Sequence, residues 1–415
     1  MQVKTLLNHV EKHKGFVYGR VRLAGTKNPR LVVELRARVG SKPTCSGCER
    51  PGPCYDTQPV RHFQFVPLWG FRVMFAYRMR RVNCSRCGVK VETVPWAIGK
   101  SPTTTTYAWF LANWAKRMSW KEVADTFRTS WDTVFKAVAF AVAWGLKNRD
   151  LKGIRAIGVD EVLWHRGHKY LTVVYQIDEH CRRLLWVGRD RTTETLDTFF
   201  NEFGLRARWL RWVCSDMWKP YLGVISRRAK NAVHVLDRFH IVAKMNKAID
   251  EVRAGEARKM KSEGHEPVLK HSRWCLLKRP ENLTDNQSIK LADLVRYNLR
   301  TVKAYLLKED LQQLWDEPSP EKADTFIKNW TFQAMRSRIE PVKKIARMLR
   351  RHKPLILNWF HARGLISAGP VEGMNNKLKV VTRRAYGLRT FKATQVALYH
   401  SLGALPVPKV AHRFF

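Results

Sequence analysis

Apolar residues recur along the chain with two different periods, and each change of period marks a new region. Alternating, aromatic-rich segments at 62–66 and 71–77 predict a β-hairpin. Across 107–146 the apolar residues recur every three or four positions, which is typical of helices. The pattern becomes strand-like across 155–237 and then mostly helical and charged across 241–364. We therefore expect a multidomain α+β protein.

The strand-like region predicts a small α/β core. Three consecutive strands with short turns are followed by two further strands, each preceded by a helix. The expected strands are 155–162, 169–178, 182–188, 209–215 and 232–237, with helices at 192–203 and 220–230. Three antiparallel strands and two helix-linked strands describe a ribonuclease-H-like core. In such a core the first and fourth strands lie side by side, so Asp160 and Asp216 are expected to be neighbours.

Residues 118–138 predict a helix, a short turn and a second helix. Ser119 can cap the first helix, with Glu122 completing a capping box, and Ser130 can cap the second. Ordinary helical hairpins share this pattern, but in a DNA-binding helix-turn-helix the early exposed positions of the second helix face DNA. Those positions are Trp131, Asp132, Thr133 and Lys136. Trp131 suits either packing or stacking on an unpaired base, and the sequence leaves both open.

The charge of the chain identifies the class of partner. Lys and Arg number 76 against 35 Asp and Glu, which gives a formal net charge of +41 over 415 residues. A fold this basic repels itself, so a polyanion is the expected counterpart. The charge is spread along the chain, apolar runs are too short for a membrane span, and the N-terminus has no signal-peptide core. We expect a cytoplasmic, nucleoid-associated protein that binds double-stranded DNA and no membrane.

Four of the eight cysteines form two CxxC pairs, which predict a structural zinc site. Each pair presents two thiolates, and two pairs together complete a tetrahedral set. The predicted ligands are Cys45, Cys48, Cys84 and Cys87. Reduced thiols or a disulfide are the alternative, and Cys54 lies close enough in sequence to replace a ligand. The other three, Cys181, Cys214 and Cys275, are expected to be buried small hydrophobes.

Three acidic residues are the candidates for catalysis. Asp160 and Asp216 each end an apolar run, whereas Glu372 begins a basic helical pattern far downstream. Two carboxylates at strand ends and one from a later helix can hold two Mg²⁺ or Mn²⁺ ions for phosphodiester chemistry. The residues expected near Glu372 on its helix, or beyond a bend in it, are candidates for DNA contact, either at the scissile phosphate or non-specifically. They are Asn375, Asn376, Lys377, Lys379, Arg383 and Arg384.

Other acids near these positions have simpler interpretations. Glu161 adjoins Asp160, but successive side chains on a strand point to opposite faces, so it is not expected to be a ligand. Asp178 and Asp190 lie beside turns, where Asp commonly bonds locally. Asp237 and His240 fit either a fourth acid with a general base or a structural pair, and we favour the structural pair.

Five short motifs give the chain a resemblance to a known family. They are IGVDE at 157–161, SDMWKPY at 215–221, LDRFHI at 236–241, VEGMNNKLK at 371–379 and RRAYG at 383–387. With the paired cysteines and the helix-turn-helix upstream, the chain resembles an insertion-sequence transposase of the ISL-three group over essentially its full length. The resemblance implies a DDE transposase that binds the terminal inverted repeats of its element, cleaves there and joins the ends to a target. It implies that Asp160, Asp216 and Glu372 are the catalytic triad.

The expected domains follow the same order. They are a zinc-ribbon domain at 1–100, a helix-turn-helix at 101–150, a catalytic core at 151–243, a helical insertion at 244–364 and the last part of the core with a C-terminal tail at 365–415. Two ends must be synapsed, so a homodimer is expected. The alternatives are a DNA-binding regulator, an inactive transposase relic, or a structure-specific nuclease on the same fold.

Overall fold

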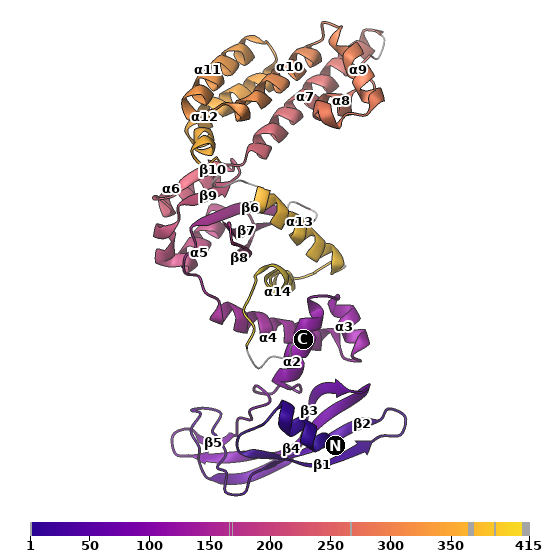
Figure 1. The fold of residues 1–415 in the computed structure, drawn as a ribbon, viewed down its shortest axis with the longest axis vertical. Coiled ribbons are helices and arrows are strands. Elements are labelled where there is room, and N and C mark those ends of the chain that lie inside the picture. Colours follow the sequence, from indigo (N-terminus) through magenta and orange to yellow (C-terminus); the bar gives the residue numbers. More distant parts are fainter. Residues whose placement is uncertain are drawn as a thin grey trace. The chain divides into compact units, whose positions relative to one another are not determined.

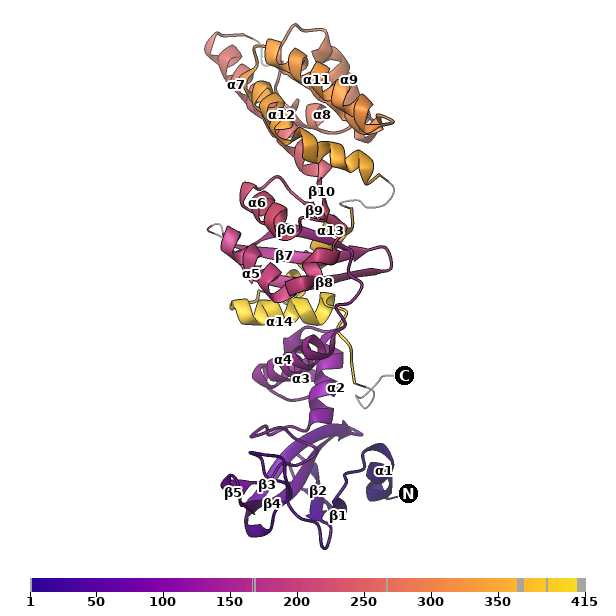
Figure 2. The same cartoon turned by 90° about the vertical axis from the view of Figure 1, so that its left-hand side faces the viewer.

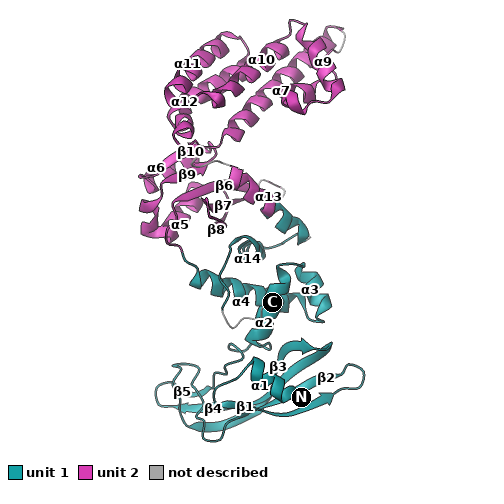
Figure 3. Cartoon of the chain, viewed as in Figure 1, with its two compact units in different colours: residues 1–150, 378–415 teal, residues 151–377 magenta. Residues whose placement is uncertain are grey.

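The computed structural model describes residues 2–165, 167, 169–265, 268–363, 369–385 and 387–408. The chain divides into two compact units, each described by itself below (Figure 3). The first contains residues 1–150 and 378–415, and the second contains residues 151–377. The expected final segment, 365–415, is thus divided between the two units. The division falls within one helix, α13 (Gly369–Arg384).

The first unit begins with a short helix, α1, and a five-stranded sheet (Figure 1). The strand order is β1-β2-β4-β3, and β5 pairs with β4. The elements are α1 (Val3–Val10), β1 (Phe16–Ala24), β2 (Arg30–Ala37), β3 (Cys54–Leu68), β4 (Phe71–Cys84) and β5 (Gly88–Val91). The antiparallel pairing of β3 with β4 confirms the predicted hairpin, with longer strands than expected. Alternate side chains of its strands, such as Phe63 and Phe75, are fully buried around Trp96.

Four helices complete the first unit: α2 (Thr105–Ala115), α3 (Trp120–Thr126), α4 (Trp131–Asn148) and α14 (Phe391–Leu402). The predicted caps are confirmed. Ser119 and Glu122 form a capping box at α3, and the Ser130 hydroxyl accepts the Thr133 N–H at the start of α4. The segment after α14 lies against α4, where a Cβ on Gly145 would meet Leu405 at 2.7 Å. The C-terminal helix therefore belongs to the helix-turn-helix unit.

The second unit contains a sheet of order β10-β9-β6-β7-β8. The strands are β6 (Ala156–His165), β7 (Lys169–Asp178), β8 (Cys181–Arg189), β9 (Trp212–Ser215) and β10 (Val233–Leu236). As expected, β6, β7 and β8 are antiparallel neighbours, and the first strand pairs with the fourth, in parallel. Two boundaries differ from the prediction by three residues. β6 continues past Val162 to His165, and β9 starts at Trp212 because η1 (Gly204–Trp209) is a 3₁₀ helix.

The pleat of β6 gives its two faces different neighbours. Ile157 and Val159 share a core with α5 (Thr193–Phe203) and α6 (Lys219–Arg228), which cover one face of the sheet in Figures 1 and 2. Gly158 faces the other way, and a Cβ there would meet Val371 of α13 at 2.3 Å. The absence of a side chain at Gly158 therefore allows α13 to approach the sheet.

A helical region follows β10 and returns to it. Its elements are α7 (Arg238–Ser262), α8 (Arg273–Leu277), η2 (Pro280–Asn282), α9 (Asp285–Val295), α10 (Arg300–Gln312), η3 (Gln313–Asp316), α11 (Pro320–Arg336) and α12 (Glu340–His361). They share a buried core that includes Leu314, Trp330 and Leu349. Near the end of α12, the Asn358 amide donates to the His234 carbonyl of β10 at 2.9 Å. No helix in the described part of the chain is long and apolar enough to cross a membrane.

Candidate active site and metal centre

Two of the predicted catalytic acids occupy adjacent strands. Val159 of β6 pairs with Ser215 of β9, so Asp160 and Asp216 follow one register position in two parallel strands. Leu236 of β10 also pairs with Ser215, so Asp237 follows the same position on the third strand. Carboxyl ends of parallel strands meet at one edge of a sheet and commonly carry functional groups. Three carboxylates therefore converge at this edge.

Asp160 is held by the helix that carries Glu372. Its Oδ1 accepts the backbone N–H of Glu161 at 2.7 Å, and its Oδ2 accepts the amide of Asn375 at 2.5 Å. The Tyr175 hydroxyl donates to the Asn375 carbonyl oxygen at 2.9 Å, which fixes the orientation of that amide. Burial raises the pKa of Asp160 above its usual range, and the hydrogen bonds oppose that shift.

Asp216 lies in a comparable environment. Its Oδ1 accepts the backbone N–H of Trp218 at 2.9 Å. Burial is the main reason that its pKa is raised, and the negative charge of Asp160 adds to the effect, whereas His240 opposes it. Burial and a second negative charge both disfavour the ionised form of this carboxyl group. A bound cation would therefore stabilise the carboxylate strongly.

Glu372 is exposed in the first turn of α13. Its charge contributes to a raised pKa at Asp237, where burial is the main cause. Asp237 also caps α7 by accepting the Phe239 N–H at 2.9 Å, and His240 Nε2 lies 3.7 Å from its Oδ2. This cap fits the structural role that we favoured. The proximity to the other acids, which sequence reasoning underweighted, also makes Asp237 a candidate ligand.

The acids are near one another without forming a closed ligand cluster. Among the described residues, only the four cysteines have three or more ligand atoms that all lie within 4.8 Å of one another. The donor chemistry of the acidic edge nevertheless fits a hard divalent cation, because its available atoms are carboxylate oxygens.

Glu161 takes partners different from those of Asp160, as the alternation along a strand predicts. Its Oε1 accepts from Arg191 at 2.9 Å, and that guanidinium lies 3.9 Å from the Tyr170 ring centroid and 4.7 Å from that of Trp218. Burial raises the pKa of Glu161, and Asp216 adds to the shift. The local bond expected of Asp178 is present, since its Oδ2 accepts from the Gln176 amide at 2.7 Å, and its Oδ1 also accepts the Ala156 N–H of the neighbouring strand at 3.1 Å.

The predicted DNA contacts on α13 differ in exposure. Asn375 is turned toward Asp160, and its proposed phosphate contact stays a prediction. Asn376, Lys377, Lys379 and Arg383 are exposed. Arg384 is half-buried and donates to the Lys116 carbonyl at 3.1 Å.

On α4, Trp131 is 43 % exposed, and Thr133 is half-buried because it belongs to the N-cap. Lys136 is exposed and pairs with Asp132 at 2.6 Å. These positions start the second helix, where a DNA-binding helix-turn-helix presents its reading residues.

The four paired cysteines form a single cluster in the first unit. Their sulfurs lie within 4.8 Å of one another, with Cys48 Sγ 3.5 Å from Cys84 Sγ. The backbone N–H groups of Arg86 and Cys87 lower the pKa of Cys84 to about 6, whereas the neighbouring Cys48 raises the pKa of Cys87 to about 12. Four sulfurs this close can all be thiolates only with a cation among them. A Cβ on Gly47 would lie 3.1 Å from Cys87 Sγ, so this knuckle needs the small residue. The cluster fits a zinc ribbon.

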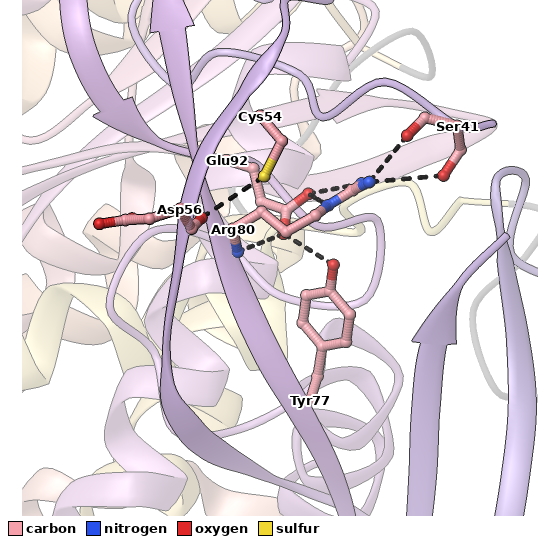
Figure 4. Close-up of polar contacts among 6 residues, drawn as sticks. All are labelled: Ser41, Cys54, Asp56, Tyr77, Arg80 and Glu92. Carbon is pink, nitrogen blue, oxygen red and sulfur yellow. Dashed lines mark hydrogen bonds and ion pairs between the residues drawn. The ribbon is translucent and has the colours of Figure 1, made fainter. Parts of the chain in front are cut away.

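Cys54 lies outside this cluster. Its thiol is exposed and donates to the Asp56 carbonyl at 3.5 Å (Figure 4). The prediction for the scattered cysteines is confirmed for Cys214 and Cys275, which are buried. It is wrong for Cys181, which is half-buried because it opens β8 beside a turn and contacts Gln176.

A buried ion pair beside the cluster was missed by the sequence reasoning. The Glu92 side chain is fully buried, pairs with Arg80 at 2.8 Å and accepts from the Tyr77 hydroxyl at 2.7 Å (Figure 4). Arg80 also donates to the Ser41 carbonyl at 2.8 Å. Glu92 forms a β-bridge with Cys45, so this network supports the first cysteine knuckle.

Known proteins similar to this chain identify its family. Residues 157–398, more than half of the chain, match the DDE family of the ISL-three group described as "Transposase". The chain belongs to this transposase family. It is 29 % identical to the transposase for insertion sequence element IS1001 of Bordetella parapertussis, over 90 % of this chain and 92 % of that protein. It is 30 % identical to the transposase for IS1557 of Mycobacterium tuberculosis, over 88 % of this chain and 86 % of that protein.

Among solved structures, a Drosophila P element transposase strand transfer complex matches with a TM-score of 0.38 and 7 % identity. The match covers 72 % of this chain and 91 % of that one. Membership of the DDE transposase family makes the chain a DNA transposase of an insertion sequence.

Proposed function

We propose that this transposase cleaves DNA at the ends of its insertion sequence and joins those ends to a target, with Asp160, Asp216 and Glu372 as the catalytic acids. The observation that carries the proposal is the bond from Asn375 to Asp160. Asn375 lies one helical turn after Glu372, so it ties the helix of the third acid to the strand of the first.

The second unit supplies the catalytic site, on a ribonuclease-H-like core. The three acids hold Mg²⁺ or Mn²⁺, with Asp237 as a further candidate ligand. When bound, two such ions activate a water or a 3′-hydroxyl and stabilise the leaving oxygen. Asn375 and Trp218 orient Asp160 and Asp216 through hydrogen bonds to one oxygen of each carboxylate.

The first unit supplies recognition of the terminal inverted repeats. Its Cys₄ cluster holds structural zinc, and the start of α4 presents Trp131, Thr133 and Lys136 to DNA. The net charge of +41 supports binding to phosphates, so affinity falls steeply as salt rises. A homodimer accounts for the pairing of two ends. The cytoplasm, with the protein on nucleoid DNA, is the proposed location.

The test is a cleavage and joining assay with purified protein, labelled duplex carrying the terminal repeats of the flanking element, and Mg²⁺ or Mn²⁺. Nicks at the repeat boundary and joined products are expected. Binding without cleavage under either metal would indicate a regulator or an inactive relic. Hydrolysis without joining would indicate a nuclease on the same fold.

A further inference from the structure

The first unit contains a pocket of about 650 Å³ that the proposed catalytic chemistry does not use. It is bounded by the starts of α3 and α4, by the end of α13, by residues 387–390 and by α14. Its apolar lining includes Trp120, Trp131, Leu388, Ala393 and Ala397. This volume is in the range of pockets that take small organic ligands.

Two indole rings form one wall of the pocket. The ring centroids of Trp120 and Trp131 are 5.5 Å apart, and Phe135 stacks on Trp131 at 5.5 Å with an interplanar angle of 10°. Trp120 is 8 % exposed and fixed in the core, whereas Trp131 is 43 % exposed. A supported, accessible indole is suited to stacking on a flat, aromatic ligand.

The charges around the pocket select the class of ligand. Lys121, Arg384 and Arg389 line it, and no Asp or Glu does, although Lys121 also pairs with Asp125 at 2.7 Å on the exposed side of α3. Arg384 is held in place by its bond to the Lys116 carbonyl. A second copy of this chain would bring a net charge of +41 to three cations, so a protein partner of that kind is disfavoured. Phosphate groups complement these cations.

The position of the pocket connects it with DNA. Trp131 is the first residue of α4, immediately after the Ser130 cap. It therefore lies at the N-terminal end of the helix, the end that is proposed to enter the DNA groove. Ser401 is exposed in the lining and adds a hydroxyl suited to a hydrogen bond with the edge of a base, whereas His400, also in the lining, already bonds to the backbone of Ala112. Aromatic stacking, polar edge contacts and a cationic rim are together the requirements for holding an unstacked nucleotide.

We propose that this pocket takes one nucleobase flipped out of the terminal-repeat duplex, with stacking on Trp131 and with Lys121 and Arg389 facing the flanking phosphates. The inference rests on the proposed function, because it requires a DNA end bound at α4. It assigns Trp131 to the capture of an unpaired base and not to reading a paired one.

The test measures binding of terminal-repeat duplexes that carry a single mismatch at each position in turn, by fluorescence anisotropy without divalent metal. Unpairing costs less at a mismatch, so a flipped position is recognised by tighter binding, which we expect to be about tenfold at one position. Trp131→Ala should remove that tightening, and Trp131→Phe, which keeps a stacking ring, should restore most of it. Arg389→Gln should weaken binding to matched and mismatched duplexes alike.

Trp274→Ala is the matched control, because Trp274 is 56 % exposed in the second unit and should leave the mismatch profile unchanged. A complex with no favoured mismatch position, or a preference that survives Trp131→Ala, would overturn the pocket assignment and leave the proposed cleavage activity standing. A protein that binds no terminal repeat would contradict both proposals. The two failures are therefore distinguishable.

Discussion

The cysteines of the first unit and the acids of the second are both candidate metal ligands, but the fold assembles them differently. Cys84 and Cys87 flank one tight turn between β4 and β5, and Cys45 is bridged to Glu92 just beyond that hairpin. Cys48 and Cys84 are 36 positions apart, and the β3–β4 hairpin between them helps to bring all four sulfurs within 4.8 Å of one another. Asp160 and Glu372 are more than two hundred residues apart, and their elements are joined through the packing of α13 on the sheet and the bond from Asn375 to Asp160.

This difference implies different consequences of mutation. A ligand set that joins two knuckles of one sheet is part of the fold of that sheet, so its loss should unfold the surrounding structure. An acid set that sits at the edge of an independently packed sheet should be removable with the fold intact. The following predictions test that contrast, from the largest expected effect to the smallest.

The largest effect is expected from Cys84→Ser. The variant should lose its zinc and unfold the N-terminal sheet, because structural zinc contributes about 10 kcal/mol or more in small modules. Mass spectrometry measures the zinc content of the variant, and circular dichroism measures the loss of its β-structure. Cys54→Ser is the control and should keep one zinc per chain. A folded, DNA-binding Cys84→Ser protein would show that the sheet does not depend on the metal.

Glu92→Gln sharpens the same point without touching a ligand. It removes the carboxylate charge beside the Arg80 guanidinium, whose side chain is 12 % exposed and which keeps its bond to the Ser41 carbonyl, and should lower the free energy of unfolding by about 3–5 kcal/mol. Glu34→Gln breaks an exposed pair with Arg36 in the same sheet and should cost about 0–1 kcal/mol. Urea denaturation compares the two. If both variants lose the same free energy of unfolding, the buried network around Glu92 does not support the cysteine knuckles.

Asn375→Ala tests the link between α13 and the sheet. Removing the amide frees Asp160 Oδ2 and should slow strand cleavage about 10- to 100-fold, as loss of a residue that orients a ligand does. Binding of terminal-repeat DNA should not change. Asn286→Ala, at an exposed position of α9 in the helical region, is the control and should cleave at the normal rate. Equal rates in the two variants would remove Asn375 from the site.

The smallest effect concerns His400 in the first unit. Burial, with Lys116 and Arg384 nearby, lowers its pKa to about 3, from 6.5. The folded state thus binds the proton more weakly than the unfolded state. Its contribution to stability is full above pH 6.5 and is lost as the pH falls toward 3, by about 2 kcal/mol from pH 7 to pH 5. In denaturant melts, the free energy of unfolding of His400→Gln should fall by about 2 kcal/mol less than that of the wild type between pH 7 and pH 5. An equal fall in both proteins would contradict the lowered pKa of His400.

The sequence predicted local features more completely than long-range ones. The caps at Ser119 and Ser130 and the closeness of the paired cysteines depend on residues a few positions apart or on one hairpin. The strand order followed from the succession of elements, three strands joined by short turns and then two strands that each follow a helix. The inward turn of Asn375 and the assignment of α14 to the first unit depend on tertiary packing. Hydrophobic period alone does not encode such contacts.

Glu92 and the pocket beside Trp131 escaped sequence reasoning for a related reason. A lone Glu beside Val91 carries no pattern that indicates its own burial, and its partner Arg80 lies on another strand. Gly158, by contrast, stood within a recognised motif, and only the structure shows that α13 approaches the sheet there.

The central claim is that Glu372, exposed on α13, completes a catalytic site with Asp160 and Asp216. The most direct test is the cleavage and joining assay on terminal-repeat DNA with Glu372→Gln, beside Glu281→Gln at an exposed position of the helical region. The account predicts that Glu372→Gln binds the repeat normally and forms neither nicks nor joined products, while Glu281→Gln behaves as the wild type. A Glu372→Gln protein that cleaves and joins at the wild-type rate would contradict it.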